Sequence, residues 1–101
     1  MAKPFQYHFT WDPVKAKQNL RKHGVAFDHA ATIFQDPEAL SEFDEEHSHL
    51  EDRWITLGLA SSGTVLVVCH TYEETSEISA RIRIISARKP TKRETMQYRK
   101  G

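Results

Sequence analysis

The spacing of hydrophobic and polar positions predicts a helix near the start of this 101-residue chain. In residues 13–23, apolar side chains such as Ala16 and Leu20 recur at the spacing that places them on one helical face. Asp12 precedes the segment as a good N-cap, and Gly24 suits the position just past its end. The segment should therefore form a helix of about three turns.

A second, shorter helix is predicted within residues 26–37. Asp36 should end it, because the residue before a proline avoids helical backbone angles. Its apolar residues follow the i, i+3, i+4, i+7 spacing of one helical face, namely Phe27, Ala30, Ala31 and Phe34. The segment PFQYHFTW, before the first helix, alternates only loosely. It could form a first strand or remain irregular.

Most of the remaining chain has the pattern of antiparallel strands. The apolar, β-branched segment TVLVVCHTY is the expected central strand, and Ser61-Ser62-Gly63 before it should form a tight hairpin. The polar segments DEEHSHLED and EETSE are expected to be turns. Strands are predicted at four places, namely residues 39–43, 53–60, 64–72 and 77–86.

A closing helix is predicted after the last strand. Thr91 and Glu94 have the spacing of a capping box, and the helix should run to about Arg99. The expected order is two helices, three or four strands, and a helix. This is an α+β organisation with helices on one face of an antiparallel sheet and the other face open. The length fits one domain over residues 1–101.

The overall composition excludes several classes of protein. Apolar residues make up 39% and charged residues 28%, as in an ordinary globular protein. No stretch approaches the about 18 consecutive apolar residues of a membrane span, and the start lacks the apolar core of a secretory signal. Cys69 is the only cysteine, so no internal disulfide can form and a reducing, cytoplasmic location is expected.

The charges are balanced in total but segregated along the chain. The chain has 14 basic and 14 acidic residues and a formal net charge of zero. Residues 36–52 contain eight acids and no lysine or arginine, whereas residues 81–100 contain eight bases and a single acid, Glu94. A strong local field can therefore exist in a neutral protein.

The basic segment begins on the last predicted strand. Arg81 and Arg83 alternate with isoleucines, so both should point outward, about 7 Å apart. Arg88 follows at the strand exit. Further bases, at the exit and at the start of the closing helix, would add to the attraction for phosphate, namely Lys89, Lys92 and Arg93. The alternative is a solvated face on which Arg81 and Arg83 pair with Glu73, Glu74 or Glu77.

Histidines are the candidates for acid–base chemistry near neutral pH. His70 ends the central strand and could equally be a partly buried, hydrogen-bonded side chain. His23 ends the first helix beside Lys22 and could equally serve as a helix cap. His47 and His49 lie in an acidic turn without a recognised metal-ligand spacing, so no metal site is expected.

Several motifs together resemble the BrnT family of ribonuclease toxins from type II toxin–antitoxin pairs. They are WD-x-x-KA-x-x-NL-x-KHGV-x-F-x-x-A, E-x-RW-x-T-LG, VLVV-x-HT and RIRIISAR-x-x-T-x-RE-x-x-x-Y. The resemblance implies a RelE-like fold, metal-independent cleavage of RNA, and inhibition by a BrnA-type antitoxin, with a dimer forming through the toxin–antitoxin assembly. Ala26 stands where the family often has Ser or Thr before the phenylalanine of the second helix.

These observations lead to a prediction of roles for the site residues. Metal-free RNA cleavage uses the 2′-hydroxyl as nucleophile, so it needs a base, an acid and cations around the phosphate. The predicted catalytic residues are His23, His70, Arg81, Arg83 and Arg88. The predicted RNA-binding residues are Lys22, Lys89, Lys92, Arg93 and Tyr98, and no cofactor is expected. The alternative function is a non-catalytic basic module that binds an acidic protein or a nucleic acid.

Overall fold

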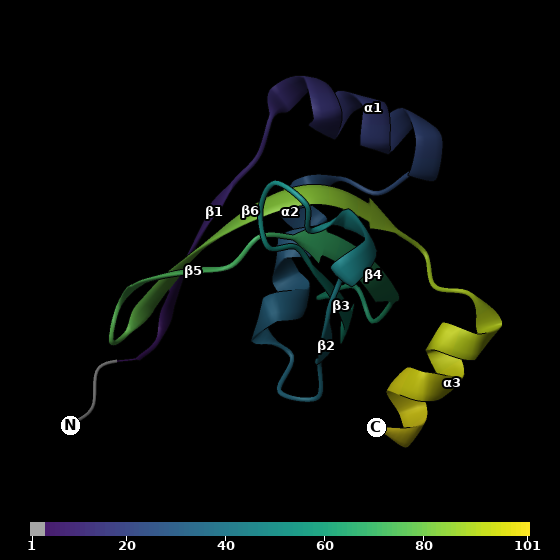
Figure 1. The fold of residues 1–101 in the computed structure, drawn as a ribbon. Helices are drawn as coiled ribbons and strands as arrows, with labels where there is room; N and C mark the ends of the chain where they lie inside the picture. The colour runs from purple at the N-terminus through teal and green to yellow at the C-terminus, as the bar shows by residue number, and fades with distance from the viewer. Residues whose placement is uncertain (1–3) are drawn as a thin grey trace.

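A computed structural model describes residues 4–101 of the chain, and Figure 1 shows their arrangement. Helices lie around a twisted sheet, with α1 above it, α2 behind it and α3 at the C-terminal side. The elements in chain order are β1 (Gln6–Thr10), α1 (Pro13–His23), α2 (Phe27–Ala30), the 3-10 helix η1 (Ala31–Gln35), β2 (Leu40–Phe43), the 3-10 helix η2 (Glu45–His47), β3 (Trp54–Leu59), β4 (Val65–His70), β5 (Glu73–Ser76), β6 (Ser79–Arg88) and α3 (Lys92–Lys100).

The ten-residue strand β6 organises the sheet. The strand order is β1-β6-β4-β3-β2, and β5 also pairs with β6. The first half of β6 lies between β1, which is parallel to it, and β5, which is antiparallel. Its second half pairs with β4. In Figure 1, β1, β5 and the first half of β6 extend together away from the rest of the sheet.

The α+β class is confirmed, but the predicted antiparallel sheet of three or four strands is wrong. The described residues form a mixed sheet of six strands, and the order begins with β1 instead of a helix. The segment EETS, expected to be a turn, is the exposed strand β5. Its polar residues have no hydrophobic alternation, and they become a strand through pairing with β6. Local spacing also contains no information about a parallel partner such as β1.

The predicted helix ends are confirmed. The Asp12 side chain accepts hydrogen bonds from backbone N–H groups of the first turn of α1, and Gly24 ends the helix with a left-handed φ of 71°. The Thr91–Glu94 capping box of α3 is present. The second predicted helix divides into the short α2 and η1, and Ala26 supplies no side-chain cap for it.

The main hydrophobic core lies between one face of the sheet and the α2–η1 segment. The largest fully buried core residues include Ile33 of η1, Leu66 of β4 and Ile82 of β6. A Cβ atom at Gly58 would lie 2.8 Å from the Ile33 Cβ, so glycine lets η1 approach β3 closely. The opposite face was expected to be open, but it is partly covered, because α3 contacts β3 there.

A β-bulge interrupts β6 halfway along its length. Cys69 pairs with Ser86, but the next residue, His70, pairs with Ile84. Ile85 is therefore an extra residue without a partner on β4. A bulge of this kind changes which face the following side chains occupy.

The bulge places three arginines on one face. Strict alternation would put Arg88 on the same face as Ile82, whose side chain is in the core. After the extra residue it is Ala87 that is buried. Arg88 consequently lies on the same face as Arg81 and Arg83.

Asn19 of α1 completes the edge of β6 that β1 leaves unpaired. β1 ends at Thr10, opposite Arg83. Further along β6, the buried Asn19 side chain donates a hydrogen bond to the Ala87 carbonyl oxygen at 2.8 Å and accepts one from the Ala87 N–H at 3.0 Å. It also donates to the Val25 carbonyl oxygen at 2.9 Å. Within residues 4–101, no helix is long and apolar enough to cross a membrane.

Candidate active site

Residues of β1 and β6 that lie side by side form an exposed polar surface. In the parallel pairing, His8 lies opposite Arg81 and Thr10 opposite Arg83. Tyr7 of β1 points to the other side, where its ring lies 6.0 Å from the ring of Phe34. We call this surface the arginine face, and it consists of His8, Thr10, Arg81, Arg83, Ser86 and Arg88.

A pocket of 330 Å³ lies on the arginine face around Arg81 and Arg83. Arg81 donates a hydrogen bond to Glu73 at 2.9 Å, as one of the expected pairings anticipated, and Arg83 is paired with Glu51. The two arginine side chains remain 54% and 44% exposed. Ion pairs this exposed stabilise a fold weakly, so an incoming anion can replace the carboxylates.

Glu51 is a site residue that the sequence analysis missed. It belongs to the segment DEEHSHLED, which was interpreted only as an acidic turn. Hydrogen bonding to Arg83 lowers the pKa of Glu51 more than partial desolvation raises it, and Arg53 lowers it further. The carboxylate is therefore ionised at neutral pH, directly beside the guanidinium of Arg83.

His8 is the second residue that was missed, and it is the exposed imidazole of the arginine face. The signal that could have found it is the alternation of Tyr7 and Phe9 around it, since both of these rings pack against Phe34. Because residues 4–11 alternate only loosely, the sequence did not decide whether they form a strand, and so it did not place His8 on a particular face. His8 and Arg81 thus present an imidazole and a guanidinium from neighbouring strands.

A second basic pocket, of 270 Å³, continues along β6 beyond the end of β1. His23 and Lys22 line it from the last turn of α1, together with Lys15 from the first turn. Ser86 of the arginine face forms part of its wall. The structure therefore brings the predicted residues His23 and Lys22 close to the basic strand.

Arg88 holds the start of α3. Its guanidinium donates two hydrogen bonds to Glu94, at 2.8 and 2.9 Å. The hydrogen bond from Arg88 is the main cause that lowers the pKa of Glu94 to about 2. The predicted RNA-binding residues near this corner are exposed, namely Lys89, Lys92 and Arg93. They lie where a longer RNA could leave the arginine face.

His70 is not brought together with the arginines. It is 3% exposed and lies on the core face, where its ring meets Phe34 edge-on. Its Nδ1 donates to the Thr71 carbonyl oxygen at 2.9 Å, and its Nε2 lies 2.6 Å from the Thr56 hydroxyl. Burial lowers the pKa of His70 below its ordinary value. The ring is thus a neutral, hydrogen-bonded core side chain, which was the expected alternative.

Tyr98, a predicted RNA-binding residue, makes a hydrogen bond within the protein. Its hydroxyl donates to an Asp36 carboxylate oxygen at 2.5 Å, and this hydrogen bond is the main cause that raises the pKa of Tyr98 to about 12. The same Asp36 oxygen accepts the Leu59 N–H at 2.8 Å. Tyr98 therefore fastens α3 to the end of η1.

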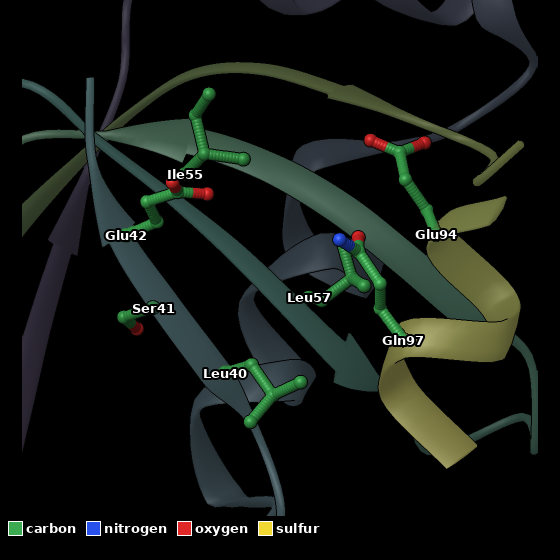
Figure 2. Close-up of a pocket in the computed structure, with 7 residues that line it drawn as sticks. All are labelled: Leu40, Ser41, Glu42, Ile55, Leu57, Glu94 and Gln97. Atoms are coloured by element: carbon green, nitrogen blue, oxygen red, sulfur yellow. The ribbon is translucent and has the colours of Figure 1, made fainter. Parts of the chain in front are cut away.

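A pocket of 390 Å³ between α3 and β3 is not suited to RNA. Figure 2 shows Gln97 of α3 pointing toward Leu57 of β3, with Glu94 of α3 on one side of the pocket and Glu42 of β2 on the other. Carboxylates on both sides would repel phosphate.

The acidic turn that contains His47 and His49 was not expected to bind a metal. His47 Nδ1 lies 2.9 Å from an Asp44 carboxylate oxygen. Among residues 4–101, no group of three or more potential ligand side chains is placed to hold a metal ion.

Comparison with known proteins agrees with this fold. The crystal structure of the Brucella abortus ribonuclease toxin, BrnT, matches with a TM-score of 0.57 and 18% sequence identity, covering 86% of this chain and 100% of that chain. At this identity the likeness concerns the fold alone. No curated protein matches the chain. The family model described as "Ribonuclease toxin, BrnT, of type II toxin-antitoxin system" matches residues 11–94, a range that holds α1, Glu51 and all of β6. The chain therefore belongs to the BrnT family of ribonuclease toxins of type II toxin–antitoxin systems.

Proposed function

We propose that the chain is a metal-independent endoribonuclease that cleaves RNA on the arginine face. The observation that supports this most directly is the neighbouring placement of His8, Arg81 and Arg83 on an exposed surface with a pocket. Guanidinium groups match the geometry of phosphate oxygens, and an imidazole can transfer a proton near neutral pH.

In the proposed reaction, the phosphate of RNA replaces the carboxylates on the arginines. Arg81 releases Glu73 and Arg83 releases Glu51, and both guanidiniums then bind the non-bridging phosphate oxygens. The 2′-oxygen then forms a bond to phosphorus, and the bond from phosphorus to the 5′-oxygen breaks. The products are a 2′,3′-cyclic phosphate and a 5′-hydroxyl end. The two guanidiniums stabilise the extra negative charge of the transition state.

Two proton transfers accompany these bond changes. We assign Glu51 as the base that accepts the proton of the 2′-hydroxyl, because it lies beside Arg83 and is released when phosphate binds there. Losing that partner brings its pKa back toward the ordinary value and makes it a better base. His8, opposite Arg81, donates the proton to the departing 5′-oxygen.

The second basic pocket extends the proposed RNA path. His23, Lys22 and Lys15 line this pocket next to Ser86. They would bind the phosphate that follows the cleaved one. His23 is also the alternative acid, and a comparison of variants distinguishes it from His8.

The toxin–antitoxin family implies an antitoxin partner. We propose that this partner is of the BrnA type and covers the arginine face, and that the toxin dimerises through the complex with it. In the cytoplasm, the free toxin would then inhibit translation by cutting mRNA. Co-expression with the neighbouring gene should restore growth. Full toxicity despite a stable complex would contradict coverage of the site.

The direct test uses the purified chain and an mRNA fragment in the presence of excess EDTA. Arg81→Ala, Arg83→Ala and His8→Gln should each reduce the cleavage rate about 10²-fold or more. Arg99→Ala, which removes an exposed arginine of α3, is the matched control and should retain the full rate. New 5′-hydroxyl ends should appear in the wild-type reaction.

Three results would contradict parts of this proposal. Loss of cleavage in EDTA would contradict metal independence. Full activity of His8→Gln together with loss in His23→Gln would move the acid to the second pocket. RNA that binds but stays intact would favour the alternative of a non-catalytic basic module.

A further inference from the structure

A small pocket with aromatic walls lies on the core face of the sheet, opposite the arginines, and has no role so far. Its volume is 240 Å³, and its lining residues are Ser41, Trp54, His70 and Tyr72. Trp54 of β3 pairs with His70 of β4, so both side chains lie on one face. Ser41 pairs with Thr56, two residues along β3 from Trp54, and lies on the same face. Pockets for drug-sized ligands are larger, about 300–1,000 Å³, so this space suits a single side chain.

Aromatic rings and a free carboxylate make this pocket attractive to a cation. Trp54 and Tyr72 line it, and the face of an aromatic ring attracts a positive charge. Glu74 of β5 pairs with the fully buried Ala80, so its side chain also lies on the core face. Burial raises the pKa of Tyr72, and the charges of Tyr7 and Glu74 raise it further, so Glu74 acts on the pocket. Within residues 4–101, Glu74 forms no ion pair.

A chain of hydrogen bonds gives the pocket an acceptor. A carbonyl oxygen only accepts, so the contact of His70 with Thr71 places the ring hydrogen on Nδ1. The Nε2 of the neutral ring must then accept from the Thr56 hydroxyl, at 2.6 Å. The Thr56 oxygen in turn accepts from the Ser41 hydroxyl, at 2.7 Å. Ser41 therefore has only lone pairs left for a ligand.

We propose that this pocket binds an arginine side chain of the antitoxin. A guanidinium is planar and stacks on aromatic rings, here Trp54 and Tyr72. Its N–H groups donate to the Ser41 oxygen, and its charge is attracted by Glu74. RNA does not suit the pocket, because no lysine or arginine lines it and Glu74 repels phosphate.

The antitoxin is the occupant because the toxin–antitoxin family implies such a partner and because this pocket meets the arginine face at the edge of the sheet. Tyr72 lines this pocket and also the pocket of Arg81 and Arg83. Strand β3 begins at Trp54, so β5 has only β6 as a neighbour among the described strands and its outer edge is open. A protein segment can therefore contact both faces around this edge. The inference rests on the proposed function only for the place of the antitoxin on the arginine face.

The first test measures binding of N-acetylarginine methylamide to the whole protein by NMR. The signal to follow is the Trp54 indole N–H, assigned with Trp54→Phe. The citrulline analogue has the same shape and a neutral urea group, and it should bind about tenfold more weakly. Tyr72→Ala should weaken binding of the arginine ligand about tenfold, whereas Tyr72→Phe retains the ring and should bind it like the wild type. Equal binding of the arginine, citrulline and norleucine analogues would overturn the proposal.

The second test measures the affinity of the toxin for the antitoxin encoded beside it. Tyr72→Ala should weaken the complex about tenfold, and Glu74→Gln about threefold. Glu77→Gln, which removes an exposed acid before β6, is the matched control and should bind like the wild type. Full affinity of both Tyr72→Ala and Glu74→Gln would overturn the proposal. A Trp54 signal that shifts with toxin concentration alone would assign the pocket to a second copy of the chain and overturn the antitoxin as its occupant.

Cleavage of RNA by the free toxin separates this inference from the proposed function. Glu74→Gln and Tyr72→Phe should cleave at the wild-type rate. Normal cleavage by a toxin that does not bind the arginine ligand would overturn the pocket and leave the proposed function intact. A toxin that binds the arginine ligand, and needs Tyr72 for the antitoxin, but cleaves no RNA would support the pocket and contradict the proposed function.

Discussion

At the scale of single residues, each arginine of the arginine face has one carboxylate partner. Arg81 pairs with Glu73, Arg83 with Glu51, and Arg88 with Glu94. The first two pairs are the more exposed, and the third is held by two hydrogen bonds to a helix cap. Phosphate should therefore displace the carboxylates of Arg81 and Arg83 and leave Arg88 at α3.

The first prediction concerns Glu51 as both competitor and base. Glu51→Gln should bind RNA about two- to fivefold more tightly, because the charge that competes for Arg83 is gone. Its kcat should nevertheless fall about 10²-fold, because the base is lost. Binding is measured with a non-cleavable 2′-deoxy oligonucleotide. Glu73→Gln is the matched control and should bind more tightly with an unchanged kcat. An unchanged kcat in Glu51→Gln would remove it as the base.

A second prediction follows from the buried, neutral His70. Its pKa is lowered from 6.5 in the folded protein, so the unfolded chain binds more protons below that pH. The free energy of unfolding should therefore stay level above pH 6.5 and fall as the pH drops below it. Urea unfolding between pH 5 and 7.5 measures this. His70→Gln should remove the slope in this range, whereas the carboxylates, such as Glu94, lose their contribution only at lower pH. A wild-type stability that is flat down to pH 5 would contradict it.

At the scale of secondary-structure elements, α1 does for β6 what a neighbouring strand would do. Asn19 satisfies both backbone groups of Ala87 through its side-chain amide. The helix thereby extends the edge protection that β1 provides only as far as Arg83. The same contact holds His23 and Lys22 next to Ser86.

The third prediction tests this contact. Asn19→Ala leaves the Ala87 N–H and carbonyl oxygen buried without partners, which should lower the free energy of unfolding by about 2 kcal/mol or more. Gln18→Ala, on the exposed side of α1, is the control and should change it by less than about 0.5 kcal/mol. Urea unfolding of both variants measures the difference. Equal stability of the two would show that water replaces Asn19.

Elements with a local cause could be predicted from the sequence, and elements with a distant cause could not. The caps of α1 and α3 depend on residues within one turn, and they were predicted correctly. The strand β5 and the bulge at Ile85 depend on pairing with residues far along the chain. The site divides in the same way. The outward positions of Arg81 and Arg83 follow from alternation, whereas Arg88 faces the same way only because of the bulge. Glu51 joins the candidate site only when a distant turn folds against β6.

At the scale of the whole molecule, a formal net charge of zero is combined with a basic working surface. The acidic segment 36–52 lies partly against β6 through Glu51 and partly along the groove of Figure 2 through Glu42. The basic residues of α1 and β6 gather around two pockets. Attraction for RNA should therefore be local and strongly sensitive to salt.

The fourth prediction quantifies this sensitivity. When a protein binds single-stranded nucleic acid, the logarithm of its affinity falls linearly with the logarithm of the salt concentration. The slope is steeper by about 0.7 for each phosphate that the protein neutralises. Arg81→Ala should therefore reduce the slope by about 0.7, and Lys92→Ala should do so only for oligonucleotides long enough to reach α3. Titrations of a 2′-deoxy oligonucleotide at several salt concentrations measure the slopes. A slope near zero for the wild type would contradict phosphate binding by the arginine face.

The bulge at Ile85 lets β6 hold one residue more than its partner strand, and the pairing resumes beyond it. Removing that one residue would restore strict alternation with the same pairs, Cys69 with Ser86 and Val68 with Ala87, so Ala87 would stay buried and Arg88 would stay outward. What the deletion removes is the local bend and the extra twist that a bulge adds. A single-codon deletion at this point should thus preserve the fold and the contact of Asn19 with Ala87, and it should change only the angle between the two halves of β6.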